Sequence, residues 1–218
     1  MFSIFKIFKK KKIVPHIRLS GVIGAVGKFK QGLDFAGQKE IIEKAFSIKK
    51  AKAVAISINS PGGSPVQSHL IYSFIRKQAK KNKKKVLVFA EDVAASGGYL
   101  IACAGDEIYA NSSSIVGSIG VIYSSFGLQD LIKKAGIQRR IYTAGKNKST
   151  LDPFVEEKRE DIERLKKIQL ELHSDFIKVV EDSRSNKLKK DGNPELFTGE
   201  FWSGSTAKKF GLIDGIGN

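Results

Sequence analysis

Ser96 is the residue of this sequence with the clearest setting for a nucleophile. It follows the strand-like run 86–90 and opens an apolar, helix-like run, with alanines and glycines on both sides. At a strand-to-helix turn a hydroxyl lies near free backbone N–H groups, which can stabilise an oxyanion. Serine is also a common helix N-cap. The passage alone therefore leaves two roles open for Ser96, nucleophile and cap.

Glycine pairs occur beside this serine and again after another strand-like run. Gly97 and Gly98 would let a substrate carbonyl approach the backbone, which a side chain would hinder. Gly62 and Gly63 end the run 51–59 and could direct N–H groups towards the same point. The residue types therefore indicate attack by a serine on a carbonyl group.

A nucleophilic serine needs a base, and the chain has only three histidines. His16, His69 and His173 lie outside any glycine- or acid-rich setting that would suggest a triad, so we interpret them as surface or packing residues. A lysine amine removed from water can act as general base near neutral pH. Lys146 and Lys148 lie in the turn-like stretch YTAGKNKSTLDPF, and composition alone does not choose between them.

The length and composition describe a basic chain with one core. Its 218 residues are enough for one substantial domain, which we place at 15–218. The net charge of +16 favours anionic surfaces, but most of the excess lies in the runs 8–12 and 80–85, which a solvated face explains. Because aromatic residues are not interleaved with these bases, we predict no nucleic-acid partner.

The single cysteine, Cys103, excludes an intrachain disulfide. It lies in the apolar run YLIACA, where a small buried packing residue is a simpler interpretation than a thiol nucleophile. Hydrolysis by a serine needs no metal and no cofactor, and we expect neither.

The N-terminal segment 1–14 is basic and amphipathic. It has too few consecutive apolar residues to cross a bilayer and shows no signal-peptide cleavage pattern. Residues 1–12 could lie in an anionic membrane interface or form a disordered basic tail. We therefore expect a protein that is cytoplasmic or peripheral on the inner membrane.

Strand-like and helix-like patterns alternate along the chain. Strands are predicted from residue 17, at 51–59, 86–90, 107–110, 118–123 and about 138–142. Helices are predicted from Val66 to the second lysine run and at about 125–134, 155–182 and 206–210. This alternation predicts an α/β domain with βαβ units and a largely parallel sheet.

Five short motifs, in this order and spacing, resemble the signal peptide peptidase A family of serine peptidases (peptidase family S49), including its short SohB-like members. They are SPGG, ASGGYLIA, GSIGV, AGKNK with a following DPF, and FTGEFWSGSTAKKFGLID, and the resemblance covers about 16–216. The resemblance implies a ClpP/crotonase-like fold and a Ser-Lys catalytic dyad.

Carried over by position, Ser96 is the expected nucleophile and Lys148, three residues after Gly145, the general base. Ser118 of GSIGV matches a serine that holds the lysine amine. Gly63 and Gly97 match the N–H donors of the oxyanion hole. The chain contains one of the two halves found in double-length members. The resemblance therefore implies a homo-oligomeric ring, by analogy an octamer, whose dyads form between neighbouring subunits.

The sequence thus predicts a serine endopeptidase that cleaves extended apolar peptides, such as signal-peptide remnants or membrane-protein fragments. A catalytically silent ring acting as a membrane-associated scaffold is the alternative, although Ser96, Ser118 and Lys148 are all present. An acyl-CoA enzyme of crotonase type would leave AGKNK without an explanation.

Overall fold

The computed structural model describes residues 13–24, 32–189 and 195–217. The chain forms two compact units, one of Met1–Gly120 with Phe176–Asn218 and the other of Val121–Asp175. Most of the predicted segment 1–14 lies outside the described residues. A single domain over 15–218 stays a prediction.

In the described part of the first unit, seven strands form one sheet. They are β1 (His16–Ser20), β2 (Ala53–Ser60), β3 (Lys85–Ala95), β4 (Glu107–Ala110), β5 (Ile115–Gly117), β6 (Phe201–Ser203) and β7 (Gly215–Ile216). The order β1-β2-β3-β4-β7 is parallel throughout. β5 pairs in parallel with the last residues of β3, and β6 pairs antiparallel with β5. The predicted largely parallel α/β sheet is confirmed.

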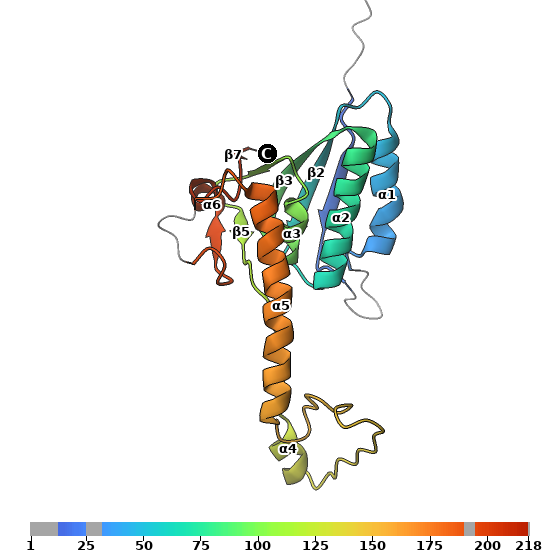
Figure 1. The fold of residues 1–218 in the computed structure, drawn as a ribbon, viewed down its shortest axis with the longest axis vertical. Helices are drawn as coiled ribbons and strands as arrows, with labels where there is room; N and C mark the ends of the chain where they lie inside the picture. The colour runs from blue at the N-terminus through green and yellow to red at the C-terminus, as the bar shows by residue number, and fades with distance from the viewer. Residues whose placement is uncertain (1–12, 25–31, 190–194, 218) are drawn as a thin grey trace, which may run out of the picture. The chain divides into compact units, whose positions relative to one another are not determined.

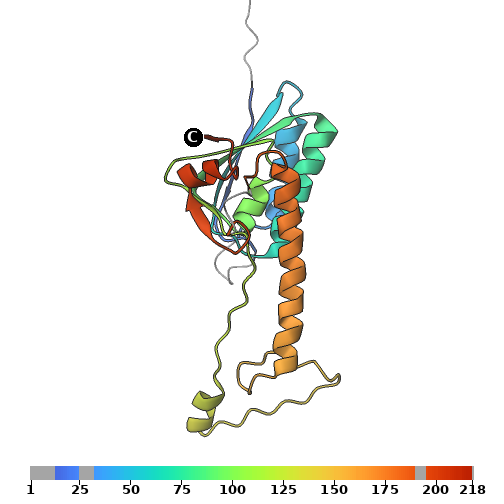
Figure 2. The same ribbon diagram turned by 60° about the vertical axis from the view of Figure 1, so that its left-hand side comes forward.

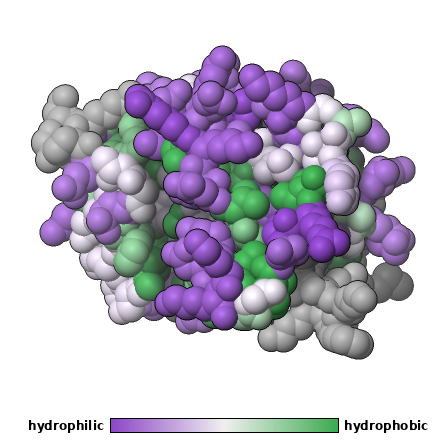
Figure 3. All heavy atoms as spheres, turned by 90° about the horizontal axis from the view of Figure 1, so that it is seen from below, coloured by the Kyte–Doolittle hydropathy of each residue, from purple (hydrophilic) through white to green (hydrophobic). Residues whose placement is uncertain are grey.

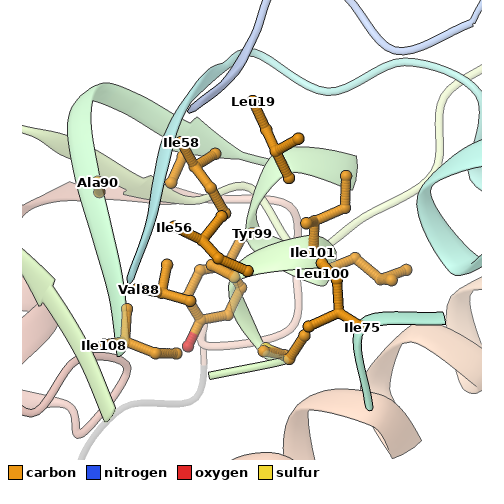
Figure 4. Close-up of a cluster of buried hydrophobic side chains, with 14 of the residues drawn as sticks. Leu19, Ile56, Ile58, Ile75, Val88, Ala90, Tyr99, Leu100, Ile101 and Ile108 are labelled. Carbon is orange, nitrogen blue, oxygen red and sulfur yellow. The ribbon is translucent and has the colours of Figure 1, made fainter. Parts of the chain in front are cut away.

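Helices α1 (Phe35–Ser47), α2 (Pro65–Asn82) and α3 (Gly97–Ala102) cover one face of β1, β2 and β3 (Figures 1 and 2). Alternate residues of β2, from Val54 to Ser60, are buried on that face. Figure 4 shows Ile56 and Ile58 of this strand packed with side chains from α2 and α3. Full burial of each such side chain stabilises the fold by about 1.5–3 kcal/mol.

The ends of α2 follow from its sequence. The Ser64 hydroxyl accepts a hydrogen bond from the N–H of Gln67, and Pro65 occupies the first turn, where its missing N–H costs nothing. Lys83 ends the helix in the left-handed conformation, with φ of 52°. The helix predicted from Val66 is therefore confirmed.

Helix α1 was not among the predicted elements. It begins after Asp34, whose carboxylate accepts a hydrogen bond of 2.7 Å from the N–H of Gly37. Ile42, Ala45 and Phe46 are buried on its inner face. The cap and the spacing of these apolar residues are signals from which it could have been predicted.

Two predicted strands are wrong. Strand β5 ends at Gly117, and no regular structure follows over 118–128, because Gly117 and Ser118 both have positive φ, 114° and 53°. The stretch 138–142 pairs with no described strand, and 91% of Tyr142 is exposed. Without a neighbouring strand, the backbone groups of this run have no partners for the hydrogen bonds of a sheet.

The C-terminal part of the chain completes the first unit with the end of α5 (Arg159–Arg184) and with α6 (Gly204–Lys209). The Tyr99 hydroxyl donates to the carbonyl of Leu212 at 2.7 Å. Arg184 is fully buried and its Nη1 donates to Asp214 at 2.8 Å. Burial alone would raise the pKa of Asp214, but hydrogen bonds from Arg184, Lys187 and the Ile108 N–H outweigh it, and the pKa lies below its ordinary value.

The second unit contains α4 (Gln129–Lys134) and the first part of α5. The Leu128 N–H donates to the Pro153 carbonyl at 2.6 Å, and Arg139 pairs with Asp152 at 2.9 Å. Helix α4 buries none of its residues.

In the view of Figure 3, hydrophobic residues are exposed between hydrophilic ones on the surface of the protein. No described helix is both long and apolar enough to span a membrane.

Candidate active site

Ser96 stands at the turn between β3 and α3 in a strained backbone conformation, with φ of 52° and ψ of −124°. Such a conformation costs a serine on the order of 1–3 kcal/mol and persists only where the surroundings enforce it. Its N–H donates to the Gly117 carbonyl at 2.8 Å, which ties the turn to β5. Ser96 occupies the N-cap position of α3, but its hydroxyl makes no capping hydrogen bond. Capping therefore does not account for a serine at this position.

The SPGG turn lies directly against Ser96. A Cβ added to Gly62 would lie 2.8 Å from the Ser96 Cβ and 2.9 Å from the Gly97 nitrogen. The turn is held by Ile23, whose N–H donates to the Gly62 carbonyl and whose carbonyl accepts from Ser64, both at 2.8 Å. Only glycine allows this approach of two backbones, since φ at Gly62 is +103°.

Two backbone N–H groups beside Ser96 are free to bind a ligand. Among the described residues, neither the Gly63 nor the Gly97 N–H donates a hydrogen bond. Ile23 pairs with the Gly62 carbonyl and the Ser64 N–H, so this bridge leaves the Gly63 N–H unused. Gly97 is the first residue of α3, where an N–H has no partner within the helix. Both groups can therefore serve as donors to an oxyanion; their role in an oxyanion hole stays a prediction.

Packing requires glycine at both Gly97 and Gly98, and the substrate access expected from the sequence stays a prediction. A Cβ on Gly97 would collide with the Ser68 hydroxyl of α2, and one on Gly98 would lie 2.6 Å from the Ser60 carbonyl of β2. The two glycines allow α3 to pack directly on β2 and α2, which fixes the Ser96 turn.

Ser118 occupies the corresponding place after β5. Ala95 is registered with Gly117, so Ser96 and Ser118 are the next residues of two neighbouring strands. The Ser118 N–H donates to the Glu200 carbonyl at 2.7 Å. Its hydroxyl is partly buried and has no hydrogen-bond partner in the part of the chain that the structure describes.

Lys148 lies in the second unit, in an exposed turn where its N–H donates to the Gly145 carbonyl at 3.2 Å. Lys146 is exposed in the same turn. The structure thus brings together Ser96, Ser118, Gly63 and Gly97 in the first unit. The pairing of Ser96 with Lys148 stays a prediction.

Two of the histidines make other contacts. His16 lies 2.6 Å from the Ser57 hydroxyl, and the His69 ring packs 5.9 Å from that of Tyr72. Cys103 is buried, and burial raises the pKa of its thiol to about 12, so the prediction of a packing residue is confirmed. Within the described ranges, no group of three or more His, Cys, Asp or Glu side chains could hold a metal ion.

Sequence reasoning missed one residue that shapes this site. Trp202 of β6 packs on Gly117, where an added Cβ would lie 2.8 Å from Trp202 Cε3. Of the two glycines that the sequence indicated in SPGG, Gly62 makes the close approach to Ser96. The motifs FTGEFW and SPGG contain both residues, but no local pattern shows which turn each one contacts.

Comparison with known proteins shows the family to which the chain belongs. The sequence model described as peptidase family S49 matches residues 78–218, well over half of the chain. The chain belongs to peptidase family S49. A Clp protease model also matches 38–116. The predicted membership in this family of serine peptidases is confirmed.

The relatives of this S49 chain are longer proteins. It is 59% identical to a protein named Na(+)/H(+) antiporter NhaA from Brucella melitensis, over 94% of the chain but only 28% of the antiporter. It is 33% identical to the chloroplastic serine protease SPPA of Arabidopsis thaliana, over 89% of the chain and 29% of that protein. Protease 4 of Haemophilus influenzae is 33% identical over 82% of the chain and 28% of its own length.

The fold is similar to that of solved Clp proteases. A ClpP1 variant from Listeria monocytogenes superposes with a TM-score of 0.54, covering 93% of this chain and 91% of ClpP1 at 15% identity. The predicted ClpP/crotonase-like fold is confirmed.

Proposed function

We propose that this chain is a serine endopeptidase with Ser96 as nucleophile and Lys148 as general base. The observation that carries the proposal is the strained, uncapped Ser96 beside the free N–H groups of Gly63 and Gly97. A serine hydroxyl and two N–H donors are what the acylation of a serine by a peptide requires.

In the proposed reaction the Ser96 oxygen attacks the peptide carbonyl carbon while its proton passes to the Lys148 amine. The N–H groups of Gly63 and Gly97 bind the resulting oxyanion. Collapse of the intermediate breaks the C–N bond, and the lysine ammonium gives its proton to the leaving amine. The Lys148 amine then takes a proton from water, whose oxygen attacks the ester carbon. When this second intermediate collapses, the ester C–O bond breaks, the lysine ammonium returns the proton to the Ser96 oxygen, and the acid product leaves. Ser118 holds the lysine amine in place throughout.

We propose that the chain assembles as a ring, by analogy an octamer, in which each dyad joins two subunits. Lysine acts as a base near neutral pH when its amine is removed from water, whereas Lys148 is exposed in the single chain. The second unit also exposes large apolar side chains, including 88% of Ile122 and 81% of Phe126. Neighbouring subunits covering this unit would bury both the apolar surface and the lysine.

The proposed substrates are extended, mostly apolar peptides, such as signal-peptide remnants or fragments of membrane proteins. A segment similar to this chain also forms part of the Brucella protein named as a Na(+)/H(+) antiporter. The proposed site of action is the cytoplasm or the inner-membrane surface, with contact through residues 1–12.

Hydrolysis of apolar fluorogenic peptides by the wild type, Ser96→Ala and Lys148→Ala tests the mechanism, with the assembly mass measured alongside. Both variants should lose at least about 100-fold in kcat, the order expected when charge stabilisation or proton transfer is lost. Lys146→Ala, in the same turn, is the matched control and should remain active. Activity in Ser96→Ala would refute the mechanism.

Mixing the two inactive variants tests the arrangement of the dyad. If dyads join two subunits, mixed rings contain some complete sites and regain part of the activity. Inactive mixed rings of confirmed composition would place both residues of a dyad in one subunit. A wild type that assembles but cleaves no peptide would favour the scaffold alternative.

A further inference from the structure

Two lysine-rich stretches, 44–53 and 77–85, contain ten lysines and neither an aspartate nor a glutamate. Lys44 and Lys85 are paired with Glu40 and Glu107, and Lys84 is buried. The other seven are exposed and make no ion pair with any described residue, and we refer to them as the lysine pole. They are Lys49, Lys50, Lys52, Lys77, Lys80, Lys81 and Lys83.

The fold brings the two stretches together at one end of the first unit. The Lys85 N–H donates to the Lys52 carbonyl at 3.2 Å, and the buried Lys84 amine donates to the Ile48 carbonyl at 2.6 Å. The parallel strands begin at this end and α1 and α2 finish there, at the top of the first unit in Figure 1. Two stretches that are far apart in the sequence therefore form one cationic surface.

Two acids close to the lysine pole are paired with basic residues outside it. Asp106 lies just before β4, the strand next to β3, and pairs with Arg76. Glu107, the first residue of β4, pairs with Lys85. Seven like charges on one small surface repel one another and lower the stability of the fold. Their repulsion is relieved when an anionic surface binds to them.

Exposed apolar residues and the first described residues, from Ile13, lie at the same end. The Pro15 carbonyl accepts from the Ala55 N–H near the beginning of β2. Ile13, Val14 and Ile48 are 43%, 53% and 39% exposed. The described chain therefore enters β1 from this end.

We propose that the lysine pole docks the folded unit on an anionic lipid surface. Lysines attract anionic headgroups, and exposed aliphatic side chains beside them can enter the interface. Nucleic acid fits less well, because the only aromatic residue of the two stretches, Phe46, is buried, and Arg76 is already paired. This proposal does not depend on the peptidase mechanism.

Docking at this pole leaves the Ser96 turn free. Strand β3 runs from Lys85 at the pole to Ala95 beside Ser96, and eleven residues of strand span on the order of 30 Å. Substitutions at the pole should therefore leave the hydrolysis of soluble peptides unchanged, which provides a check of folding.

Vesicle co-sedimentation of the full chain tests the proposal, with phosphatidylcholine vesicles containing about 30% phosphatidylglycerol compared with pure phosphatidylcholine. The wild type should bind only the anionic vesicles and should be released at about 1 M salt, where the screening length falls to about 3 Å. The test variant replaces six pole lysines by glutamine: Lys49, Lys50, Lys52, Lys80, Lys81 and Lys83. Each lysine contributes about fivefold to partitioning, so binding should fall at least about 100-fold.

A control variant with the same net charge replaces six exposed lysines elsewhere by glutamine: Lys133, Lys134, Lys158, Lys166, Lys167 and Lys178. It should bind anionic vesicles as the wild type does. If both variants lost vesicle binding equally, binding would depend on net charge alone, and the proposal would be overturned. It would also be overturned if Lys9–Lys12→Gln abolished binding while the pole variant kept it, or if the pole variant lost binding only to a duplex oligonucleotide.

Discussion

Ser96 and Ser118 follow the registered ends of two neighbouring parallel strands, β3 and β5, and both have positive φ, 52° and 53°. The pair Ala95–Gly117 precedes them, and the Ser96 N–H donates to the Gly117 carbonyl. Two serines 22 positions apart therefore leave the sheet side by side in conformations that serine rarely adopts.

Replacing Ser96 by glycine should give an inactive protein that is more stable than Ser96→Ala. Glycine adopts φ of 52° without strain. The stability gained in this way is larger than the stability lost because glycine has more conformational freedom in the unfolded chain. Urea denaturation should show a difference of about 1 kcal/mol. At Ser73, an exposed position inside α2, the order should reverse, with glycine about 1 kcal/mol less stable than alanine. Equal stability of the two Ser96 variants would show that the turn is unstrained.

Gly62→Ala should remove most peptidase activity and destabilise the first unit. Its new Cβ would lie 2.8 Å from the Ser96 Cβ, so the turn must move. Gly21→Ala is a matched control, since Gly21 has φ of +108° but nothing within 4 Å of an added Cβ. Both variants incur backbone strain of about 1–2 kcal/mol, but only Gly62→Ala should also lower kcat, by at least about 100-fold. Similar kcat values in the two variants would separate the SPGG turn from catalysis.

Trp202→Ala should lower kcat more than it raises KM. Trp202 packs on Gly117, whose carbonyl holds Ser96, so its loss loosens the turns of both serines without removing a substrate contact. Trp202→Phe, which keeps an aromatic ring, should recover much of the loss. Phe201→Ala, a neighbouring residue that is 56% exposed, should have little effect. A change confined to KM would assign Trp202 to substrate binding instead.

The stability of the first unit should depend on the ionisation of Cys103. Burial raises the pKa of this thiol from an ordinary value of 9.0 to about 12. The folded chain therefore keeps a proton that the unfolded chain loses, and the resulting stability is present below pH 9 and falls as the pH rises towards 12. At about pH 10.5 the wild type should have lost about 2 kcal/mol more than Cys103→Ala.

Urea denaturation of both proteins at pH 7 and about 10.5 measures this difference, since all other groups titrate in both. At pH 8 the folded thiol should also resist alkylation until urea is added. Parallel loss of stability in the two proteins would show that Cys103 does not titrate differently on unfolding.

Local patterns in the sequence determined the parallel α/β fold and the candidate nucleophile. The apolar runs of β2 and β3 and the glycine-flanked Ser96 are local patterns, so they can be recognised from the sequence alone. The same local reasoning failed after Gly117, where positive φ ends the strand, and it did not separate a capping role for Ser96 from a nucleophilic one.

Only the tertiary structure decided which distant residues meet. It placed Gly62 against Ser96, Trp202 on Gly117, and Lys52 beside Lys85, because strand register and helix packing join segments that are far apart in sequence. It also showed that Gly97 and Gly98 serve the packing of α3 on β2 and α2. The sequence names the chemical groups, but the distances between them depend on how the whole chain packs.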